Sequence, residues 1–379
     1  MADSIYLDYA AATPMDPAVL LAMQPYFADI FFNPSATYAA AQQVRKELDV
    51  ARSRVAHWLG ARPSEIVFTA GGTEANNLAI RGTLQQFPDG NLVVSSIEHE
   101  SVLAAAHDYD HRIAEVTPDG IVDIQKLVDL IDDSTVLVSV MYANNEVGTI
   151  QPIRQIAQAL TEIRKVRRQN GNNRPLYFHT DAAQAAAYLD LHTARLGVDL
   201  MTINAGKMHG PKQVGALFVG SKVYLRPQIV GGGQERGLRS GTENIAGAIG
   251  LAKALDLVQE RRHDEVNRLR QLQQLFFEQI EAKFPNAVIN GSRKNRLPNN
   301  VHVTFPDKDN ERLLFQLDEA GILCAAGSAC SASTDEPSHV LTAMGKTDQE
   351  AQSSLRFTMG LYTTEAEIVR TLETLSSLV

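Results

Sequence analysis

Both cysteines of this sequence lie in one short stretch, GILCAAGSACSAS, residues 321–333. It holds Cys324 and Cys330, the only cysteines among 379 residues. A disulfide between them would close a very short loop and would stabilise so long a chain little. A zinc site usually has four ligands, and only His339 follows nearby, so we expect no metal. Two buried apolar cysteines and one reactive thiolate remain as alternatives.

Three further motifs carry residue types that together suit pyridoxal phosphate (PLP). GGTEANN, residues 71–77, places glycines and a hydroxyl at an expected helix start. That start suits a phosphate, and it can equally be a plain turn capped by Thr73. Asp181 ends a predicted strand, where it either caps the next helix or pairs with a cationic ring nitrogen. Lys207, in a glycine-rich turn after another strand, can form the Schiff base that PLP requires.

Polar residues also follow two other predicted strands. His99 can lie against an aromatic cofactor and share in proton transfer, or it can be a surface polar residue. Asn144 and Asn145 can contact a ligand, or they can bond to their own backbone in a turn. Lys212, in the same turn as Lys207, is expected to be a solvated or carboxylate-paired cation.

The elements that must position these groups alternate between short β-rich runs and helical patterns. The β-rich runs are residues 65–70, 91–96, 135–143, 176–180, 199–204 and 215–220. This alternation predicts an α/β fold with a mainly parallel sheet covered by helices, and ligands gather at the carboxyl ends of such strands. Residues 243–284 predict a long helix that connects two domains, and an α+β tail ends in a helix from Thr364.

Composition and charge exclude several classes of function. The net charge of −9 argues against a general nucleic-acid binder. The one basic run, from Arg164 to Arg174, fits a helix C-terminus followed by a polar loop. No apolar stretch reaches the roughly 18 residues that cross a bilayer. The first residues lack a secretory-signal pattern, and with so few cysteines we expect a cytoplasmic protein.

A series of motifs in a fixed order gives the chain a specific family likeness from Ile5 to about Thr364. It resembles the group I, NifS/IscS-like cysteine desulfurases of the class V aminotransferase family. The motifs that carry the resemblance are YLDYAAATP, GGTEANN, IEHESV, NNEVG, HTDAAQ, GKMHGPKQVGAL, GLRSGTEN, GSACSAS and EPSHVL.

This resemblance implies the architecture of a fold type I PLP-dependent transferase. A large PLP-binding domain with a mainly parallel seven-stranded sheet would span residues 14–262. A smaller α+β domain would combine residues 1–13 and 263–379, with a mobile catalytic cysteine loop at about 324–336. The family pattern also implies a homodimer.

The resemblance further implies a role for each matched residue. Lys207 would carry PLP as a Schiff base, Asp181 would pair with the ring nitrogen and His99 would stack on the ring and take part in catalysis. Cys330 would carry the persulfide, whereas Cys324 is expected to pack as an inert residue. The other implied contacts are Gly72 and Thr73 to the phosphate, Gln184 and Asn145 to the cofactor ring and its surroundings, Thr242 to the partner subunit's phosphate, and Arg356 with Asn145 to the substrate.

The chain departs from the family pattern at three positions. Asn204 and Gly206 replace the serine and histidine that usually precede the lysine, and both lost side chains serve the phosphate in the family. Asn204 can still donate from its amide and Gly206 only from its backbone, so we expect weaker retention of the cofactor. Tyr38 stands where the family usually has histidine.

The implied activity is PLP-dependent removal of sulfur from L-cysteine, which gives L-alanine and a Cys330 persulfide. An acceptor or scaffold protein would then take the sulfur for iron–sulfur cluster assembly or tRNA thiolation. Alternatives on the same scaffold are a selenocysteine or cystine lyase, and a weakened paralogue that mainly delivers sulfur. An aminotransferase would not need a cysteine on an arm of small residues. We expect neither nucleic acid nor membrane as a partner.

Overall fold

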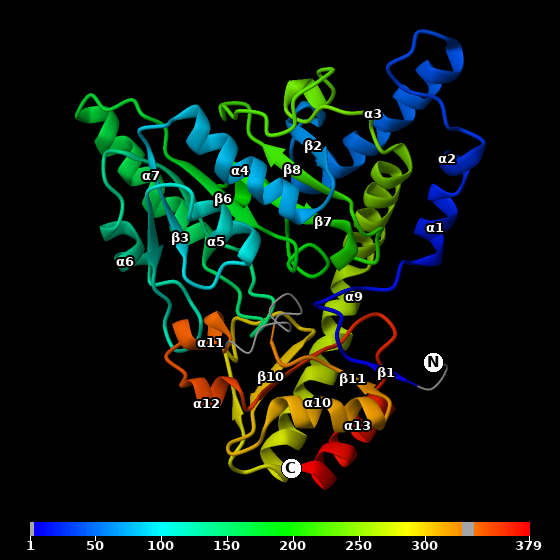
Figure 1. Cartoon of the computed structure of the whole chain (residues 1–379), viewed down its shortest axis with the longest axis vertical. Coiled ribbons are helices and arrows are strands. Elements are labelled where there is room, and N and C mark those ends of the chain that lie inside the picture. The colour runs from blue at the N-terminus through cyan, green and yellow to red at the C-terminus, as the bar shows by residue number, and fades with distance from the viewer. Residues whose placement is uncertain (1–3, 328–336) are drawn as a thin grey trace.

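The computed structural model describes residues 4–327 and 337–379, and a seven-stranded sheet forms its centre (Figure 1). The strand order is β2-β8-β7-β6-β5-β3-β4. The strands are β2 (Ile66–Thr69), β3 (Asn91–Ser95), β4 (His111–Ala114), β5 (Thr135–Ser139), β6 (Tyr177–Asp181), β7 (Leu200–Asn204) and β8 (Gly215–Val219). The six predicted strands and the mainly parallel seven-stranded sheet are confirmed.

The direction of the strands decides where their ends meet. β8 runs antiparallel to β7 and to β2, and the other neighbouring pairs are parallel. β2 therefore points the same way as β7. The carboxyl ends of β2, β7, β6, β5 and β3 consequently share one edge of the sheet, which is where ligands bind in such folds.

Side chains of the sheet alternate between two apolar clusters. In β3, Leu92 and Val94 belong to one cluster, whereas Val93 belongs to the other. Successive strand residues point to opposite faces, so both faces of this sheet are buried. This explains why the strands have nearly continuous apolar sequences.

The one strand of this sheet that the sequence did not predict is β4, at its edge. Its residues begin with His111 and Arg112, and three of its four residues are at least partly exposed. A half-exposed edge strand lacks the apolar run by which the buried strands were predicted.

Helices cover both faces of the sheet, and α4 packs against strands β5 to β8 (Figure 1). The 39-residue helix α9 confirms the predicted long helix and runs from the sheet to the other part of the molecule. The α-helices are α1 (Pro17–Met23), α2 (Pro25–Ala28), α3 (Ala39–Leu59), α4 (Gly72–Gln86), α5 (Glu100–Ala106), α6 (Ile124–Asp129), α7 (Ile153–Gln169), α8 (Thr193–Leu196), α9 (Ile245–Lys283), α10 (Asn310–Glu319), α11 (His339–Ala343), α12 (Asp348–Ala351) and α13 (Glu365–Leu378). Three 3₁₀ helices are η1 (Pro63–Glu65), η2 (Ala205–Lys207) and η3 (Glu235–Gly237).

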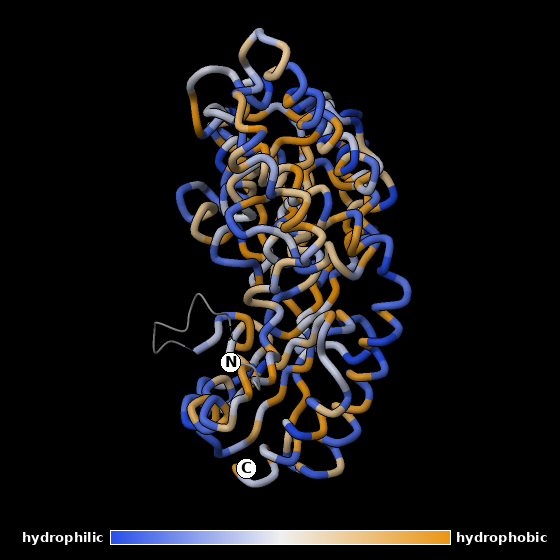
Figure 2. Tube along the Cα trace, turned by 90° about the vertical axis from the view of Figure 1, so that its right-hand side faces the viewer, coloured by the Kyte–Doolittle hydropathy of each residue, from blue (hydrophilic) through white to orange (hydrophobic). Residues whose placement is uncertain are grey.

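Two small sheets lie outside the central one. β9 (Val288–Ile289), β10 (Asn300–Thr304) and β12 (Ser354–Thr358) form an antiparallel sheet with β10 in the middle. β1 (Ile5–Tyr6) pairs in parallel with β11 (Ile322–Leu323), so the chain start lies beside a late segment. Figure 2 shows apolar segments running through the interior of both the upper and the lower part.

One passage of the chain between these two parts lies within a continuous helix, α9. The predicted domain boundary after residue 262 falls inside α9, and the division into domains stays a prediction. In residues 4–327 and 337–379, no helix combines the length and apolarity needed to cross a membrane.

Candidate active site

The predicted site residues follow different strands, and the sheet brings these strand ends to one edge. Gly72 follows β2, Asn204 ends β7, Asp181 ends β6, His99 follows β3 and Asn145 follows β5. These residues are separated by up to 132 positions in sequence, from Gly72 to Asn204. The arrangement of the strands in the sheet therefore brings together residues that are far apart in sequence.

The first turn of α4 has no side-chain cap on its backbone N–H groups. The residue before it, Gly71, has a φ of 129° and gives no side-chain cap, so the alternative in which Thr73 caps this helix is wrong. A Cβ at Gly215 of β8 would lie 2.6 Å from the carbonyl carbon of Gly71, so only glycine permits this close approach. Uncapped N–H groups at a helix start favour a phosphate, because the helix dipole is positive there.

Asn204 and Gly206 lie beside this helix start. A Cβ placed on Gly72 would be 3.4 Å from Nδ2 of Asn204. The other side-chain atom, Oδ1 of Asn204, accepts the N–H of Gly206 at 3.1 Å. Since Oδ1 is held by its own turn, the amide group of Asn204 faces Gly72, where a donor is needed.

The lysine of the candidate site ends η2, close to the N-terminal segment. Nζ of Lys207 donates to the carbonyl of Ala10 at 2.7 Å and to that of Ala11 at 2.6 Å. Nε2 of Gln184 donates to the same Ala10 carbonyl at 3.0 Å. The structure therefore brings Lys207 and Gln184 together, as the sequence suggested.

Thr13 fixes the turn that carries Lys207. Its N–H and its hydroxyl both donate to the carbonyl of Gly206, and its hydroxyl oxygen accepts the N–H of His209 at 2.8 Å. Lys212, expected to be a solvated or carboxylate-paired cation, is exposed and donates to the carbonyl of Thr13 at 2.9 Å. The N-terminal segment thus acts as a strap across the lysine turn.

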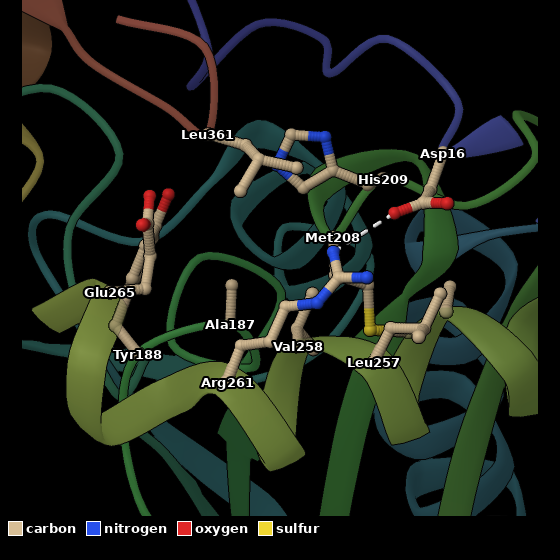
Figure 3. A pocket seen from close by; sticks show the side chains of 11 residues that line it. Asp16, Ala187, Tyr188, Met208, His209, Leu257, Val258, Arg261, Glu265 and Leu361 are labelled. Carbon is tan, nitrogen blue, oxygen red and sulfur yellow. Dashed lines mark hydrogen bonds and ion pairs between the residues drawn. The ribbon is translucent and has the colours of Figure 1, made fainter. Parts of the chain in front are cut away.

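A small pocket lies between the lysine turn and α9 (Figure 3). Met208 and His209 line it from the turn, and Leu257 and Val258 line it from the helix. Arg261 reaches across to Asp16, with 3.1 Å between Nη1 and Oδ2. Burial lowers the pKa of His209, which favours a neutral imidazole in this mainly apolar wall.

Asp181 is almost fully buried and accepts two hydrogen bonds. Oδ2 accepts from Nδ2 of Asn76 at 2.7 Å, and Oδ1 accepts from the N–H of Ala183 at 2.9 Å. The second bond holds a turn, because residues 183–188 form turns and not the helix that Asp181 was expected to cap as one alternative. Both carboxylate oxygens act as acceptors, so the group keeps the chemistry needed to pair with a cationic ring nitrogen.

His99 caps the start of α5 with its ring. Nδ1 accepts the N–H of Ser101 at 3.0 Å and lies 2.8 Å from the Ser101 hydroxyl oxygen. That oxygen in turn accepts from Asn76 at 2.8 Å. Sequence reasoning missed Asn76 and Ser101, although both stand in quoted motifs within five residues of a predicted site residue.

Arg356 is buried in β12 and faces the loop after β5. Its Nη2 donates to Oδ1 of Asp8 at 2.7 Å, and its Nη1 donates to the carbonyl of Asn145 at 3.1 Å. Nε of Arg356 is buried and has no hydrogen-bond partner in the part of the chain described here. Asp8, in the motif YLDYAAATP, was also missed from the sequence.

Two buried residues join the loops after β3 and β5. Oε1 of Glu98 accepts the N–H of Met141 at 2.6 Å, and Nδ2 of Asn144 donates to the carbonyl of Ile97 at 3.0 Å. Burial raises the pKa of Glu98 well above its usual range, which favours its neutral form. Asn144 also accepts two backbone N–H groups in its own turn, which is the turn role that the sequence allowed for it.

Two predicted or noted residues lie apart from this group. Thr242 is exposed and lines a separate cavity. Thr69 and Ala70, which precede α4 in the chain, line the same cavity. Tyr38 is exposed at the start of α3 and packs edge-on against Phe32.

The structure describes Cys324 but not Cys330. Cys330 lies outside the described residues, as does most of the predicted loop at 324–336. Cys324 follows β11 and packs against the main apolar cluster, which confirms the predicted packing role. Burial raises the pKa of the Cys324 thiol to about 12.

The donor set of this edge fits PLP. Lys207 offers an amine and Asp181 a carboxylate for a ring nitrogen. Gly72 and Asn204 border an uncapped helix start for a phosphate, and His99 offers an aromatic face. Each requirement of the cofactor has a matching group at the same edge of the sheet.

Comparisons with known proteins agree with this chemistry. The family model described as aminotransferase class-V matches residues 5–371. A cysteine desulfurase IscS from Dictyoglomus turgidum is 39% identical over 386 residues, which cover 100% of this chain and 95% of the relative. A solved NifS-like protein matches with a TM-score of 0.90 and 31% identity over 99% of both chains. A structure described as SspA in complex with cysteine matches with a TM-score of 0.81 and 34% identity, over 95% of this chain and 100% of that one. The chain therefore belongs to the class-V aminotransferase family, among its IscS- and NifS-like cysteine desulfurases.

Proposed function

We propose that this chain is a PLP-dependent cysteine desulfurase that converts L-cysteine to L-alanine and collects the sulfur on Cys330. One observation carries the proposal: the segment from Asp8 to Ala11 touches both Arg356 and Lys207. Asp8 and Ala10 are two residues apart, so their Cα atoms are at most about 7 Å from each other. A guanidinium and an amine so placed suit the carboxylate and the Cα of one small amino acid.

The residues that would hold PLP are those of the sheet edge. Asp181 would pair with the ring nitrogen, His99 would stack on the ring, and Lys207 would form the covalent link. The remaining contacts of the proposal are Gly72, Thr73 and Asn204 at the phosphate, with Gln184 and Asn145 near the ring. Gly206 lies beside the phosphate contacts, and its N–H is bonded to Oδ1 of Asn204. When bound, PLP supplies an electron sink that stabilises negative charge at the substrate Cα.

The protein's own groups then bind the substrate and move its protons. Arg356 binds the carboxylate of L-cysteine, because a planar guanidinium can hold both oxygens. Asn145 lies beside it through its carbonyl. Nζ of Lys207 takes and returns the proton at Cα, since it is a base on a turn fixed by Thr13.

The sulfur step balances without an external oxidant. The thiolate of Cys330 attacks the sulfur of the substrate, the S–S bond forms and the C–S bond breaks. The substrate Cβ keeps the electron pair and gains a proton. L-Cysteine and the Cys330 thiol thus give L-alanine and the Cys330 persulfide.

Several wider features remain part of the proposal. The persulfide would pass to an acceptor or scaffold protein for iron–sulfur cluster assembly or tRNA thiolation, in the cytoplasm. A second copy of the chain would form a homodimer in which Thr242 reaches the partner subunit's phosphate. The support is the family to which the chain belongs and the exposed position of Thr242.

The proposal is tested by alanine formation from L-cysteine. Wild type should release alanine, whereas Lys207→Ala should lose at least about 10²-fold in rate, the usual share of a general base. Lys222→Ala is the control, because Lys222 is exposed and lies outside the site. Equal rates for Lys207→Ala and wild type would overturn the assignment of Lys207.

A further inference from the structure

Two side chains that the family chemistry leaves unused fill the space between His99 and Asp181. Asn76 comes from α4 and Ser101 from α5, and both are buried. Nδ2 of Asn76 lies 2.7 Å from Oδ2 of Asp181 and 2.8 Å from the hydroxyl oxygen of Ser101. That oxygen lies 2.8 Å from Nδ1 of His99. A continuous chain of hydrogen bonds therefore joins the imidazole to the carboxylate.

The chemistry of Asp181 fixes the direction of the bonds made by Asn76. An ionised carboxylate only accepts, so the group of Asn76 that faces it is the NH₂. The two N–H bonds of that NH₂ serve two acceptors, Asp181 and Ser101. Oδ1 of Asn76 is buried without a partner among residues 4–327 and 337–379. An unsatisfied buried carbonyl is unfavourable, so the benefit of Asn76 lies in its donors.

The direction of the next bond follows from the first. The oxygen of Ser101 accepts from Asn76, which leaves its own proton for Nδ1 of His99. Nδ1 also accepts the backbone N–H of Ser101 at 3.0 Å. A nitrogen that accepts two donors carries no proton, so neutral His99 has its proton on Nε2.

We propose that Asn76 and Ser101 are positioning residues that hold His99 in the tautomer with its proton on Nε2 and tie its ring to the Asp181 carboxylate. A proton at Nδ1 would face the backbone N–H of Ser101, which cannot turn away. His99 therefore acts as a donor through Nε2, and its ring position follows the carboxylate. The inference rests on the proposed function, in which His99 and Asp181 are the cofactor contacts.

Nitrogen NMR of ¹⁵N-histidine-labelled holoenzyme tests the tautomer. His99→Gln assigns the signals of His99 by their loss. Wild type should show a protonated Nε2 and an unprotonated, hydrogen-bonded Nδ1 at neutral pH. A His99 signal typical of a protonated Nδ1 overturns the inference.

Variants test whether the two residues act in series. Ser101→Ala should move the Nδ1 signal toward that of a nitrogen with fewer donors, and Ser101→Thr should restore it because threonine keeps the hydroxyl. Asn76→Ala should move the same signal, and the double variant Asn76→Ala/Ser101→Ala should match Ser101→Ala alone. Asn77→Ala is the control, since Asn77 donates to the carbonyl of Thr73 at 3.0 Å and at 3.5 Å to the backbone carbonyl of Ser101, and makes no bond to the Ser101 hydroxyl. Equal Nδ1 signals in Asn76→Ala and Asn77→Ala contradict the series arrangement.

The affinity for PLP tests the bond between Asn76 and the Asp181 carboxylate. Asn76→Ala should raise the dissociation constant of PLP about tenfold, the equivalent of one hydrogen bond to a charged group, whereas Asn77→Ala should leave it unchanged. Equal PLP affinity in these two variants overturns the link to Asp181. Both readouts are taken without L-cysteine, so they remain interpretable if desulfuration fails. If Asn76→Ala does not fold, the pair Ser101→Ala and Ser101→Thr still decides the inference at His99.

Discussion

At the scale of single residues, the hydrogen-bond partners in the structure identify more residues of this site than residue types in the sequence do. Lysine, aspartate and histidine suggested a cofactor site from the sequence alone, but their partners did not. Asn76 is 105 positions from Asp181, and Asp8 is 348 positions from Arg356. No local pattern connects such pairs, which explains why these supporting residues were missed.

Replacing Gly206 with histidine should strengthen retention of PLP. A Cβ at Gly206 would meet Oδ1 of Asn204 at 3.6 Å and the Cα of Lys212 at 3.8 Å, which are ordinary contacts. The turn therefore admits a side chain that can donate toward the helix start. Extensive dialysis of Gly206→His and wild type, followed by the absorbance of bound PLP, measures the difference.

The control for that comparison is Gly206→Ala, which adds a Cβ without a donor. It should retain PLP as wild type does. If Gly206→His also retains no more PLP than wild type, the missing histidine does not weaken the site.

Cys324 should resist alkylation in the folded protein. Because burial raises the pKa of its thiol to about 12, the thiolate fraction at pH 8 is roughly one in ten thousand. The fraction rises with pH, so the labelling rate should rise about tenfold per pH unit below that pKa. Peptide mass spectrometry after iodoacetamide treatment should find Cys324 unlabelled at pH 8 and labelled once guanidinium unfolds the chain. Equal labelling before and after unfolding would refute its burial.

At the scale of elements, the strands carry the site because their buried runs fix the sheet. The six buried strands and α9 were predicted from apolar pattern, since burial on both faces leaves a continuous signal. β4 was not, because its exposed edge permits His111 and Arg112. The sequence left capping of α4 by Thr73 open as an alternative, because the close approach of Gly71 to Gly215, which places Gly71 at the cap, is a tertiary contact.

A buried histidine in β6 should make the sheet sensitive to acid. Nδ1 of His179 lies 2.8 Å from the Ser139 hydroxyl of β5, and Nε2 lies 3.1 Å from the Thr202 hydroxyl of β7. Burial lowers the pKa of His179 to about 4, although nearby Asp181 partly opposes the shift. The unfolded chain binds this proton near pH 6.5, so the free energy of unfolding falls as pH drops from there to about 4.

His179→Gln should therefore flatten the dependence of stability on pH. One pKa unit is worth about 1.4 kcal/mol, so the variant should lose about 2 kcal/mol less than wild type between pH 7 and pH 5. Urea unfolding at both pH values gives the two free energies. His263→Gln is the control, because His263 is 90% exposed. Identical pH slopes for all three proteins would contradict the role of His179.

At the scale of the whole molecule, the start, middle and end of the chain meet at one place. Asp8 holds Arg356 from β12, while Ala10 and Ala11 hold Lys207 from the central sheet. The resemblance of the sequence to a family predicted that these parts belong together. The contacts to Lys207 are made by backbone carbonyls, which leave no mark in residue type, whereas the contact to Arg356 is made by the carboxylate of Asp8.

Thr13→Val should destabilise the molecule as a whole. Valine keeps the shape of the buried side chain but leaves the N–H of His209 without its acceptor, at a cost of about 1–3 kcal/mol. The midpoint of urea unfolding should fall while its slope stays constant. Thr37→Val, at an exposed position, should leave the midpoint unchanged. An unchanged midpoint in Thr13→Val would mean that the N-terminal strap is not needed for stability.

The most direct test of the central claim is to locate the sulfur after one turnover with L-cysteine. Alanine should appear in equal amount to a persulfide, and peptide mass spectrometry should place the added sulfur atom on Cys330. Cys324→Ser should behave as wild type, whereas Cys330→Ser should form no persulfide. A persulfide on Cys324, or one that persists in Cys330→Ser, would contradict the account.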